Sequence, residues 1–454
     1  MALRILIKGA GDLATGVAAE LKEQGHQIVM TEIAIPLTVR RQVACSRAVY
    51  ETEVKIEQHT AVLAQDAREA KQILQEGKIA VLIDPKAEIA RTLQPDVIVD
   101  AIMAKENLGT SMEDAPCVIA LGPGFTAGKD CHAVIETKRG DTLGIPIYKG
   151  SAIPNTGIPG MVGGYAMERL IRAGEAGKMQ PVAAIGDIVK KGDLLAITGE
   201  TKVYAAIDGV VRGMLQEGVG VKKGMKIGDV DPRMDVELAY LISDKARKIG
   251  QGVKEAIKRL RYRDYGIVCL AAGRSQRYGT SEENKLLEYK EGKPMYQYLL
   301  EQMQQFPMCD VAVVSRVPEI LEYAREHQMM AIENYEPEKG ISWSLRKGLA
   351  ACQSEKKELR GVLFAVCDQP NLSAETIERM LELACEHPGK IICAANEGKR
   401  GNPVLMDQCY FEELEQLTGD VGGKQVIQKH PEQVILCETG AMELLDVDEK
   451  GIEW

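Results

Sequence analysis

Short apolar runs alternate with helix-like stretches over the first quarter of the chain. Runs with the length and composition of buried strands occur at 4–8, 27–31, 79–83, 97–100 and 118–121. Between two of these runs, residues 60–76 have a helical pattern. Strands that alternate with helices form parallel sheets with crossover connections. We therefore expect a Rossmann-like α/β domain over residues 1–126.

The pattern changes after this segment. Two strands joined by a turn are expected at 133–148, and residues 150–164 are rich in glycine and proline. Short apolar strands separated by turns follow between 182 and 231. The segments GDIVKKGD (186–193) and GVGVKKG (218–224) resemble each other, which indicates an internal duplication.

This spacing predicts a small β-rich barrel sandwich over residues 127–235, similar to biotinyl and lipoyl modules. Those modules carry their modified lysine at an exposed hairpin tip, whereas the comparable turn, 205–209, contains no lysine. A scaffold or docking role is therefore favoured over that of a swinging-arm carrier.

Apolar residues recur at helical spacing over 237–260, which predicts one amphipathic helix. We expect residues 236–262 to form a helical linker. Beyond it, apolar runs typical of buried strands return at 265–270, 310–315 and 361–366. Helical stretches separate them, so a second Rossmann-like α/β domain is expected over 263–454.

Composition limits the possible partners. A chain of 454 residues with 45% hydrophobic residues and 44 glycines fits several α/β domains. Its net charge of -10 argues against an extended nucleic-acid surface. Without a signal-peptide pattern or a bilayer-length apolar stretch, a cytoplasmic protein with no membrane partner is expected. The 11 scattered cysteines indicate reduced thiols, and Cys131-His132 is interpreted as an incidental pair rather than a metal site.

A glycine turn follows the first predicted strand. Gly9, Gly11 and Ala14 fit the GxGxxG/A dinucleotide pattern, and Glu32 follows the second strand, where an acid could bind a ribose hydroxyl. These residues point to a possible NAD(P) site. The alternative, a glycine turn that binds no nucleotide, stays open, because Asp12 places a carboxylate where pyrophosphate would approach.

Two charged clusters are open to two interpretations each. Arg40-Arg41 could clamp an anion, but a solvated face is the more common role of paired arginines. The acidic segment 229–235, which includes Asp229 and Asp231, could bind a metal or an anion, but a charged surface turn is favoured.

The most informative stretch follows the strand at 265–270. Ala271, Ala272 and Gly273 begin a small flexible turn, Ser275 lies within it, and the cations Arg277 and Lys285 follow. A glycine turn with backbone NH groups and two cations suits a nucleoside triphosphate. An ordinary turn with solvated cations is the alternative.

Two further motifs follow in order along the chain. Ser342 and Ser344 lie where a turn enters a helix, so their hydroxyls could contact ribose or phosphate, or cap the helix. Asp368 follows the strand at 361–366, where a carboxylate could bind Mg²⁺ that bridges triphosphate oxygens. Together the three motifs place a phosphate loop, hydroxyls and a hard-metal ligand at one sheet edge.

The ordered motifs LAAGRSQRYG, NKLL, GISWSLRKGL, CDQP, RGNPV, GDVGGK and DVD resemble the molybdenum cofactor cytidylyltransferase branch of the MobA-like NTP transferases. The resemblance covers about residues 263–454. It implies that the terminal phosphate of molybdopterin-bound molybdenum attacks the α-phosphate of CTP and that pyrophosphate leaves. Arg277 and Lys285 would hold the triphosphate, and Asp368 would bind Mg²⁺.

The same resemblance assigns further residues. The pterin-phosphate side would be lined by Gly401, Asn402, Pro403, Asp420 and Gly422, within 401–403 and 419–423. Asp446 or Asp448 would be a second metal ligand, with a solvated acidic tail as the alternative. Glu282-Glu283 in the loop and Lys424 in the last glycine motif depart from the family pattern.

The first 235 or so residues resemble another family, the YqeB-type proteins of the selenium-dependent molybdenum hydroxylase system. The segments that carry this resemblance include KGAGDLATG, RRQVACSRAVYE and GSAIPNTGIPG. It implies a bifunctional maturation protein with a client molybdenum hydroxylase. Three alternatives remain: nucleotidyl transfer to a sugar or polyol phosphate, an NAD-binding redox or selenium-insertion module as the main activity, and a docking protein.

Overall fold

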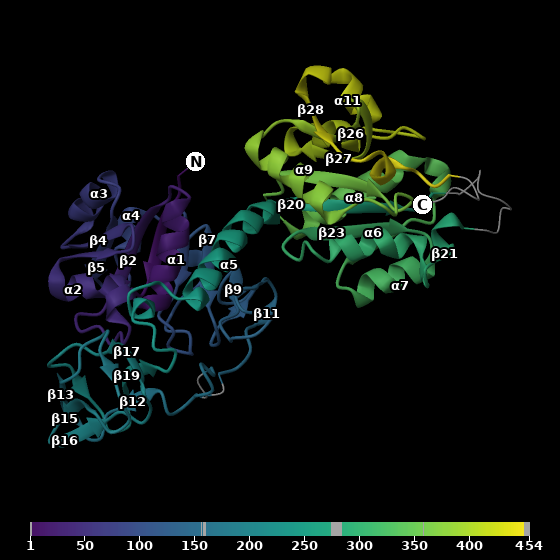
Figure 1. Cartoon of the computed structure of the whole chain (residues 1–454). Coiled ribbons are helices and arrows are strands. Elements are labelled where there is room, and N and C mark those ends of the chain that lie inside the picture. Colours follow the sequence, from purple (N-terminus) through teal and green to yellow (C-terminus); the bar gives the residue numbers. More distant parts are fainter. Residues whose placement is uncertain (1, 156, 158–159, 274–283, 357, 449–454) are drawn as a thin grey trace. The chain divides into compact units, whose positions relative to one another are not determined.

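The structure, a computed structural model, describes residues 2–155, 157, 160–273, 284–356 and 358–448 (Figure 1). The chain divides into two compact units, Met1–Lys258 and Arg259–Trp454. All 11 cysteines lie within these ranges, and none of them forms a disulfide bond there. Within the described ranges, no helix has both the length and the apolar character needed to cross a bilayer.

A nine-stranded sheet forms the centre of the first unit in the part of the chain described. Its strands, in order across the sheet, are β10 (Pro146–Ile147), β9 (Ala133–Ile135), β7 (Cys117–Leu121), β6 (Val97–Asp100), β1 (Arg4–Lys8), β2 (Gln27–Glu32), β5 (Ile79–Ile83), β4 (His59–Ala64) and β3 (Glu53–Ile56). All are parallel except the outermost pairs, β10 with β9 and β3 with β4. The associated helices are α1 (Asp12–Glu23), α2 (Ala48–Glu51), α3 (Ala67–Gln75) and α4 (Ala90–Leu93). The expected parallel α/β fold is confirmed.

The helix expected at 60–76 is wrong in its first part. Residues His59–Ala64 form β4, which pairs with β5, and the helix α3 begins only at Ala67. Asp66 fixes this start, because its carboxylate accepts hydrogen bonds from the backbone NH groups of Arg68 and Glu69.

A β-rich module follows, built from two four-stranded antiparallel sheets in the described part of the chain. One sheet contains β12 (Leu170–Arg172), β19 (Lys226–Asp231), β17 (Gly209–Met214) and β14 (Ile188–Val189), and the other β16 (Thr201–Tyr204), β15 (Leu194–Thr198), β13 (Gly177–Pro181) and β18 (Gly220–Val221). Buried residues from both sheets, such as Ile171, Leu195 and Val211, form one shared core. A two-stranded sheet of β8 (Thr126–Ala127) and β11 (Gly150–Ser151) lies before the module in sequence.

The boundary expected at 126/127 is corrected by the strand pairing. β9 pairs with β7, and β10 pairs with β9, so residues 133–147 complete the nine-stranded sheet instead of joining the β-rich module. The apolar side chain of Val134 is fully buried in that sheet's core, which gives the physical reason.

The predicted linker helix belongs to the first unit. Residues Glu237–Ala239 form a short 3₁₀ turn, and α5 (Asp244–Leu260) begins after Ser243, whose hydroxyl accepts a hydrogen bond from the NH of Ala246. α5 packs directly on α1, since a Cβ at Gly16 would lie 2.6 Å from the Ala246 side chain. The helix is therefore part of a packed core up to Lys258, where the unit ends.

The second unit contains a seven-stranded sheet within its described residues. Its order is β24 (Met330–Glu333), β23 (Asp310–Ser315), β20 (Tyr265–Ala271), β25 (Gly361–Val366), β27 (Lys399–Asp407), β26 (Ile391–Asn396) and β28 (Val434–Glu438), with a separate hairpin of β21 (Tyr289–Lys290) and β22 (Lys293–Pro294). The first four strands are parallel, and β27 runs antiparallel to both of its neighbours.

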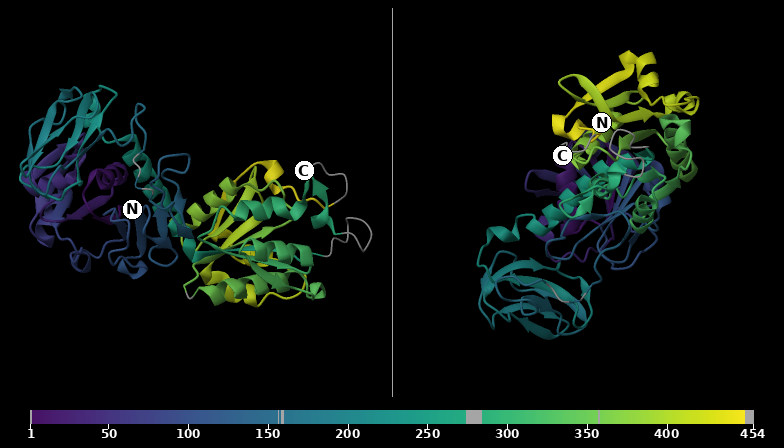
Figure 2. Two further views of the ribbon diagram at one scale, coloured as in Figure 1. Left: turned by 90° about the horizontal axis from the view of Figure 1, so that it is seen from below. Right: turned by 90° about the vertical axis from the view of Figure 1, so that its right-hand side faces the viewer.

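Helices cover both faces of this sheet (Figure 2). One core contains residues of α6 (Met295–Met303), α7 (Pro318–Glu326) and α9 (Ala374–Glu386). The other contains residues of α8 (Ile341–Glu355), α10 (Phe411–Glu415) and α11 (Lys424–Lys429). Ile267 and Cys269 of β20 belong to the first core and Val268 to the second, as the alternation of a strand requires. The carboxyl ends of the parallel strands β20 and β25 lie at the same edge of the sheet, where the predicted nucleotide-binding residues follow them.

Candidate functional site

The predicted triphosphate loop starts beside the predicted metal ligand. Leu270 of β20 is paired with Val366 of β25, and the NH of Cys367 donates to the carbonyl oxygen of Leu270 at 3.0 Å. Ala271 ends β20, and Ala272 and Gly273 leave the sheet near Asp368. The next part of the loop, with Ser275 and Arg277, lies outside the described residues.

Lys285 joins two carboxylates at this edge. Its Nζ lies 2.6 Å from Oδ2 of Asp368 and 2.8 Å from Oδ1 of Asp448. Asn284 begins the short 3₁₀ turn that holds the lysine, since its side chain accepts a hydrogen bond from the NH of Leu286. Burial opposes the ammonium charge, but the attraction of Asp368 and the hydrogen bonds to both carboxylates outweigh it and raise the pKa of Lys285. The lysine is therefore cationic at neutral pH.

The structure separates the roles of Asp446 and Asp448. Asp446 accepts a hydrogen bond at 2.9 Å from the side-chain amide of Gln369, which is 1% exposed. The NH of Val447 donates to the carbonyl oxygen of Asp368 at 3.0 Å. Burial, together with repulsion from Asp368, raises the pKa of Asp446. Asp448 is thus the carboxylate paired with Lys285, while Asp446 attaches the C-terminal segment to the turn after β25.

The donors at this edge fit a hard divalent cation. Oδ2 of Asp368 contacts Lys285, whereas Oδ1 is buried and has no hydrogen-bond partner among the described residues. No group of three or more His, Cys, Asp or Glu residues within the described ranges is arranged to hold a metal ion by itself. Mg²⁺ commonly binds through one or two carboxylates and completes its shell with substrate phosphates and water. Asp368 and Asp448 provide such a partial set.

The two predicted serines have structural partners. The hydroxyl of Ser342 donates to the carbonyl oxygen of Gly419 at 2.7 Å, and that of Ser344 accepts from the side-chain amide of Asn334 at 2.8 Å. Both serines are buried. These hydroxyls hold the start of α8 in place, but neither caps the helix, whose N-cap is Gly340. A contact of either hydroxyl with ribose or phosphate stays a prediction.

The GDVGG segment packs against the start of α8. Gly340 has φ 79°, and a Cβ there would lie 2.3 Å from the carbonyl group of Gly419. Oδ1 of Asp420 lies 3.4 Å from the NH of Ile341, and Gly422 is also close to this residue. Two motifs that are far apart in the sequence therefore form one surface at the helix N-terminus.

Gly401, Asn402 and Pro403 lie on β27, and the Asn402–Pro403 peptide bond is cis. A Cβ at Gly401 would lie 3.4 Å from the side chain of Leu444, just before Asp446. The RGNP segment is therefore next to the chain that brings Asp448 to Lys285.

The carboxylate of Glu32 binds to the backbone of the glycine turn in the first unit. Gly9 has φ 93°, and Gly11 is the N-cap of α1. Glu32 accepts hydrogen bonds from the NH groups of Ala10, at 3.0 Å, and Ile33, at 2.9 Å. Burial raises the pKa of Glu32, although both hydrogen bonds oppose this shift. The carboxylate thus stabilises the turn in the described structure.

The prediction that residues 229–235 form a charged surface turn is wrong for Asp229 and Asp231. Asp229 and Asp231 are 1% and 0% exposed. Arg212 donates to Asp229 at 2.7 Å and to Asp231 at 3.2 Å, and Arg169 lies 3.5 Å from Asp229. Arg40, expected on a solvated face, is only 7% exposed. Sequence reasoning missed Arg169 and Arg212, whose neighbours carry no recognisable motif.

Comparisons with known proteins agree with the two-part resemblance. A family model described as a MobA-like NTP transferase domain matches residues 267–434. Over 256 residues, or 56% of the chain, the protein is 48% identical to "Uncharacterized protein YqeB" of Escherichia coli K12. The chain spans about half the length of this curated relative, 47%. The expected fusion of a YqeB-like part and a MobA-like NTP transferase domain is confirmed.

Three solved structures illustrate the similarity of the chain to known folds. Rv0371c from Mycobacterium tuberculosis is 22% identical, with a TM-score of 0.35 and coverage of 41% of this chain and 92% of its own. A nucleotidyl transferase from Methanothermobacter is 20% identical, with a TM-score of 0.35 and coverage of 41% and 92%. The 4-diphosphocytidyl-2C-methyl-D-erythritol synthase of Anaerococcus prevotii is 14% identical, with a TM-score of 0.34 and coverage of 42% and 93%.

Proposed function

We propose that the C-terminal unit transfers CMP from CTP to the molybdopterin-bound molybdenum cofactor and releases pyrophosphate. The observation that carries this proposal is the group of Lys285, Asp368 and Asp448, which lies at the sheet edge where the predicted triphosphate loop begins. The MobA-like match over 267–434 supports nucleotidyl transfer as the class of reaction.

The chemistry requires no protein nucleophile. The phosphate oxygen of the acceptor is already anionic, so it can form a bond to the α-phosphorus of CTP while the bond to the pyrophosphate oxygen breaks. The residues of the site then need to hold the two substrates in line and to offset the charge that develops. Lys285, held as a cation by its two carboxylates, supplies a fixed positive charge for the triphosphate.

Asp368 and Asp448 are the residues that would hold Mg²⁺. When bound there, this cation would neutralise phosphate oxygens and orient the leaving pyrophosphate. The buried, unpartnered Oδ1 of Asp368 is the protein atom best suited to it. On this proposal, Asp420 and Gly422 at the start of α8, together with 401–403, contact the pterin-phosphate side.

For the whole chain we propose a role in maturing a molybdenum hydroxylase, with selenium dependence implied by the YqeB resemblance. A covalent fusion raises the effective concentration of consecutive activities. The YqeB-like part would act on the cofactor or the client enzyme before or after the nucleotide transfer.

Pyrophosphate release tests the reaction class and the substrate together. The full chain is incubated with CTP, GTP or ATP, Mg²⁺ and molybdopterin-bound molybdate, alongside the variants Asp368→Asn and Glu386→Gln. Glu386 is an exposed acid at the end of α9 and serves as the matched control. We expect CTP-selective release that requires the pterin, is lost in Asp368→Asn and is retained in Glu386→Gln.

Two results would redirect the proposal. Release from CTP with a sugar or polyol phosphate, and none with the pterin, would support the rival acceptor. No release from any nucleotide by the folded protein would contradict nucleotidyl transfer and favour the YqeB-like part, with an NAD-binding redox or selenium-insertion activity, as the main actor.

A further inference from the structure

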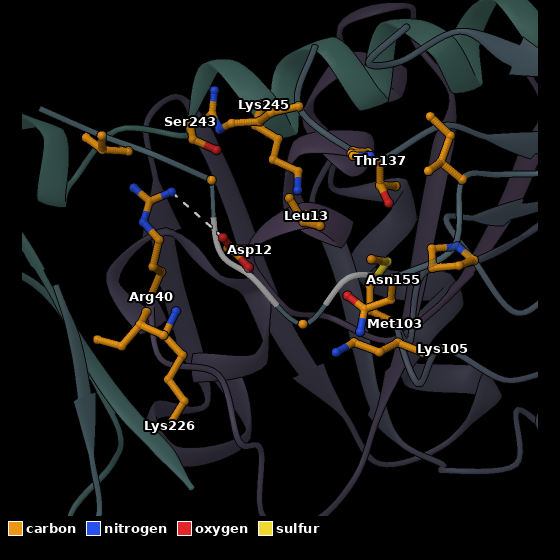
Figure 3. A pocket seen from close by; sticks show the side chains of 18 of the residues that line it. Asp12, Leu13, Arg40, Met103, Lys105, Thr137, Asn155, Lys226, Ser243 and Lys245 are labelled. Carbon is orange, nitrogen blue, oxygen red and sulfur yellow. Dashed lines mark ion pairs between the residues drawn. The ribbon is translucent and has the colours of Figure 1, made fainter. Parts of the chain in front are cut away.

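The first unit contains a cavity of about 520 Å³, whose wall includes Arg40, one of the two arginines considered above as an anion clamp (Figure 3). Its wall includes the start of α1 at Asp12, the loop after β6 at Lys105, β19 at Lys226 and the start of α5 at Lys245. These segments are far apart in the sequence. The cavity therefore depends on the packing of the nine-stranded sheet, the β-rich module and α5 within one unit.

The cavity wall is strongly cationic. Among the described lining residues, eight are Lys or Arg and one, Asp12, is acidic. Asp12 lies 3.8 Å from Arg40, so its charge is offset within the wall. The lining lysines that have no ion pair with any described residue are Lys105, Lys138, Lys226 and Lys245. An excess of unpaired cations in a hollow attracts an anion.

Buried arginines in the same wall have unsatisfied donors. Arg169 is 7% exposed, and its Nε and Nη1 have no hydrogen-bond partner among the described residues. Arg40 is also 7% exposed, and its Nε is likewise without a described partner, although Nη2 donates to the carbonyl oxygens of Leu238 and Leu241. Because these nitrogen atoms are buried, the two guanidinium groups act on an anion in the cavity through their positive charge.

Desolvation and neighbouring positive charges lower the pKa values of two lysines in the wall. Although Lys226 is exposed, the protein around its ammonium group lowers its pKa by desolvation, against the attraction of Asp229 and Asp12, and repulsion from Arg169 and Arg212 adds to the lowering. Burial, and then repulsion from Arg139, lowers the pKa of Lys245, against the attraction of Asp12, Glu136 and Asp244. A bound anion would offset the repulsion between these cations and raise the pKa values of both lysines.

Two helix N-termini add to the positive electrostatic potential in the cavity. α1, 12 residues long, begins at Asp12 with Gly11 as an N-cap that has no side-chain hydrogen bond to the helix. α5, 17 residues long, begins directly after Ser243. Asp12, Leu13, Ser243 and Lys245 all line the cavity, so both helices direct their N-terminal ends at it.

Cations approach the space beside Asp12 from several sides. In Figure 3, Lys245 extends from α5, Lys105 from the opposite loop and Lys226 from the β-rich module. These lysines come from three different segments of the wall, and a pair of phosphate groups offers them more acceptor oxygens than a single phosphate does. We propose that this cavity binds a small molecule with a diphosphate group, or a comparable pair of phosphate groups. The proposal does not rest on the function proposed for the C-terminal unit.

Calorimetric titration of the full chain with inorganic pyrophosphate, and separately with NAD⁺, tests this assignment. EDTA is present throughout, so that metal-dependent phosphate binding at Asp368 does not contribute. The double variant Lys226→Ala/Lys245→Ala removes two unpaired cations of the wall. Lys222→Ala/Lys223→Ala is the matched control, because both lysines are exposed, belong to the same β-rich module and are not among the described lining residues.

We expect the wild type and the control to bind at least one probe, and the cavity variant to bind it on the order of 100-fold more weakly. Pyrophosphate binding without NAD⁺ binding would identify a small diphosphate ligand, and tighter NAD⁺ binding a dinucleotide. Mass-spectrometric labelling of lysines in the wild type provides a second readout, in which the bound probe protects Lys226 and Lys245 but not Lys223. The proposal fails if neither probe binds, or if the folded cavity variant binds as tightly as the wild type.

Discussion

Replacing Lys285 with methionine removes the charge that holds two carboxylates together. Oδ2 of Asp368 and Oδ1 of Asp448 lie 2.6 and 2.8 Å from Nζ, so the two oxygens are at most about 5.4 Å apart. At an effective dielectric constant of about 20, their repulsion amounts to about 3 kcal/mol. Because the Asp448 side chain is 45% exposed, solvent screening reduces this to about 1–2 kcal/mol.

We therefore expect Lys285→Met to lower the free energy of unfolding by about 1–2 kcal/mol in EDTA. Mg²⁺ should restore more stability to this variant than to the wild type, since it replaces the missing cation between the carboxylates. Nucleotidyl transfer should fall on the order of 100-fold or more, because the triphosphate loses a fixed positive charge. Denaturant unfolding with and without Mg²⁺, and pyrophosphate release, measure the two effects.

Lys429→Met is the matched control, since Lys429 also pairs with a carboxylate, Glu413 at 3.2 Å, but its side chain is 58% exposed. Its effect on unfolding should be below about 1 kcal/mol. Unchanged stability in EDTA together with near-normal transfer in Lys285→Met would refute the assignment of this lysine as a charge shared by the metal ligands and the substrate.

Two further predictions concern other parts of the chain. Gly340→Ala should destabilise the second unit by about 2–4 kcal/mol, because its Cβ would lie 2.3 Å from the Gly419 carbonyl. In the same unfolding assay, Gly398→Ala, which also has positive φ but nothing within 4 Å, should cost only about 1–2 kcal/mol, and equal losses would contradict the close packing. The hydrogen bond from Arg139 lowers the pKa of Asp244 to about 2, so its stabilisation is present above about pH 4 and is lost as the pH falls through about 2. Asp244→Asn should therefore lose stability at neutral pH but show a weaker acid dependence between about pH 4 and 2, and an unchanged slope in acid unfolding would rule this linkage out.

Hydrophobic patterning predicted the sheet architecture well, because buried parallel strands consist of apolar runs. It failed at His59–Ala64, where the strand β4 was interpreted as the start of a helix. A local signal was present there, since Asp66 followed by Glu69 is typical of a helix N-terminus. The joining of β9 and β10 to the first sheet was not predictable in this way, because strand pairing over long sequence distances leaves no local pattern.

For the C-terminal site, the order of motifs along the chain predicted that Lys285 and Asp368 lie at one sheet edge. The choice between Asp446 and Asp448 needed the structure, because it depends on which way each side chain points after the C-terminal segment crosses Asp368. Ser342 has a hydroxyl at the expected place, but only packing against Gly419 shows that this hydroxyl already has a partner. For the cationic cavity, the sequence indicated only Arg40 as a candidate anion contact. That Arg40 shares a wall with Lys105, Lys226 and Lys245 could not be predicted, because these residues come from segments that meet only in the folded unit.

The most direct test of the central claim is to identify the product formed from CTP labelled at the α-phosphate. The intact chain is incubated with the labelled nucleotide, Mg²⁺ and molybdopterin-bound molybdate. The small molecules are then separated by chromatography and identified by mass spectrometry. We expect the label to appear in a cytosine dinucleotide form of the cofactor, and Asp368→Asn to form none. Label that stays in CTP, or appears only in an adduct without the pterin, would contradict this expectation.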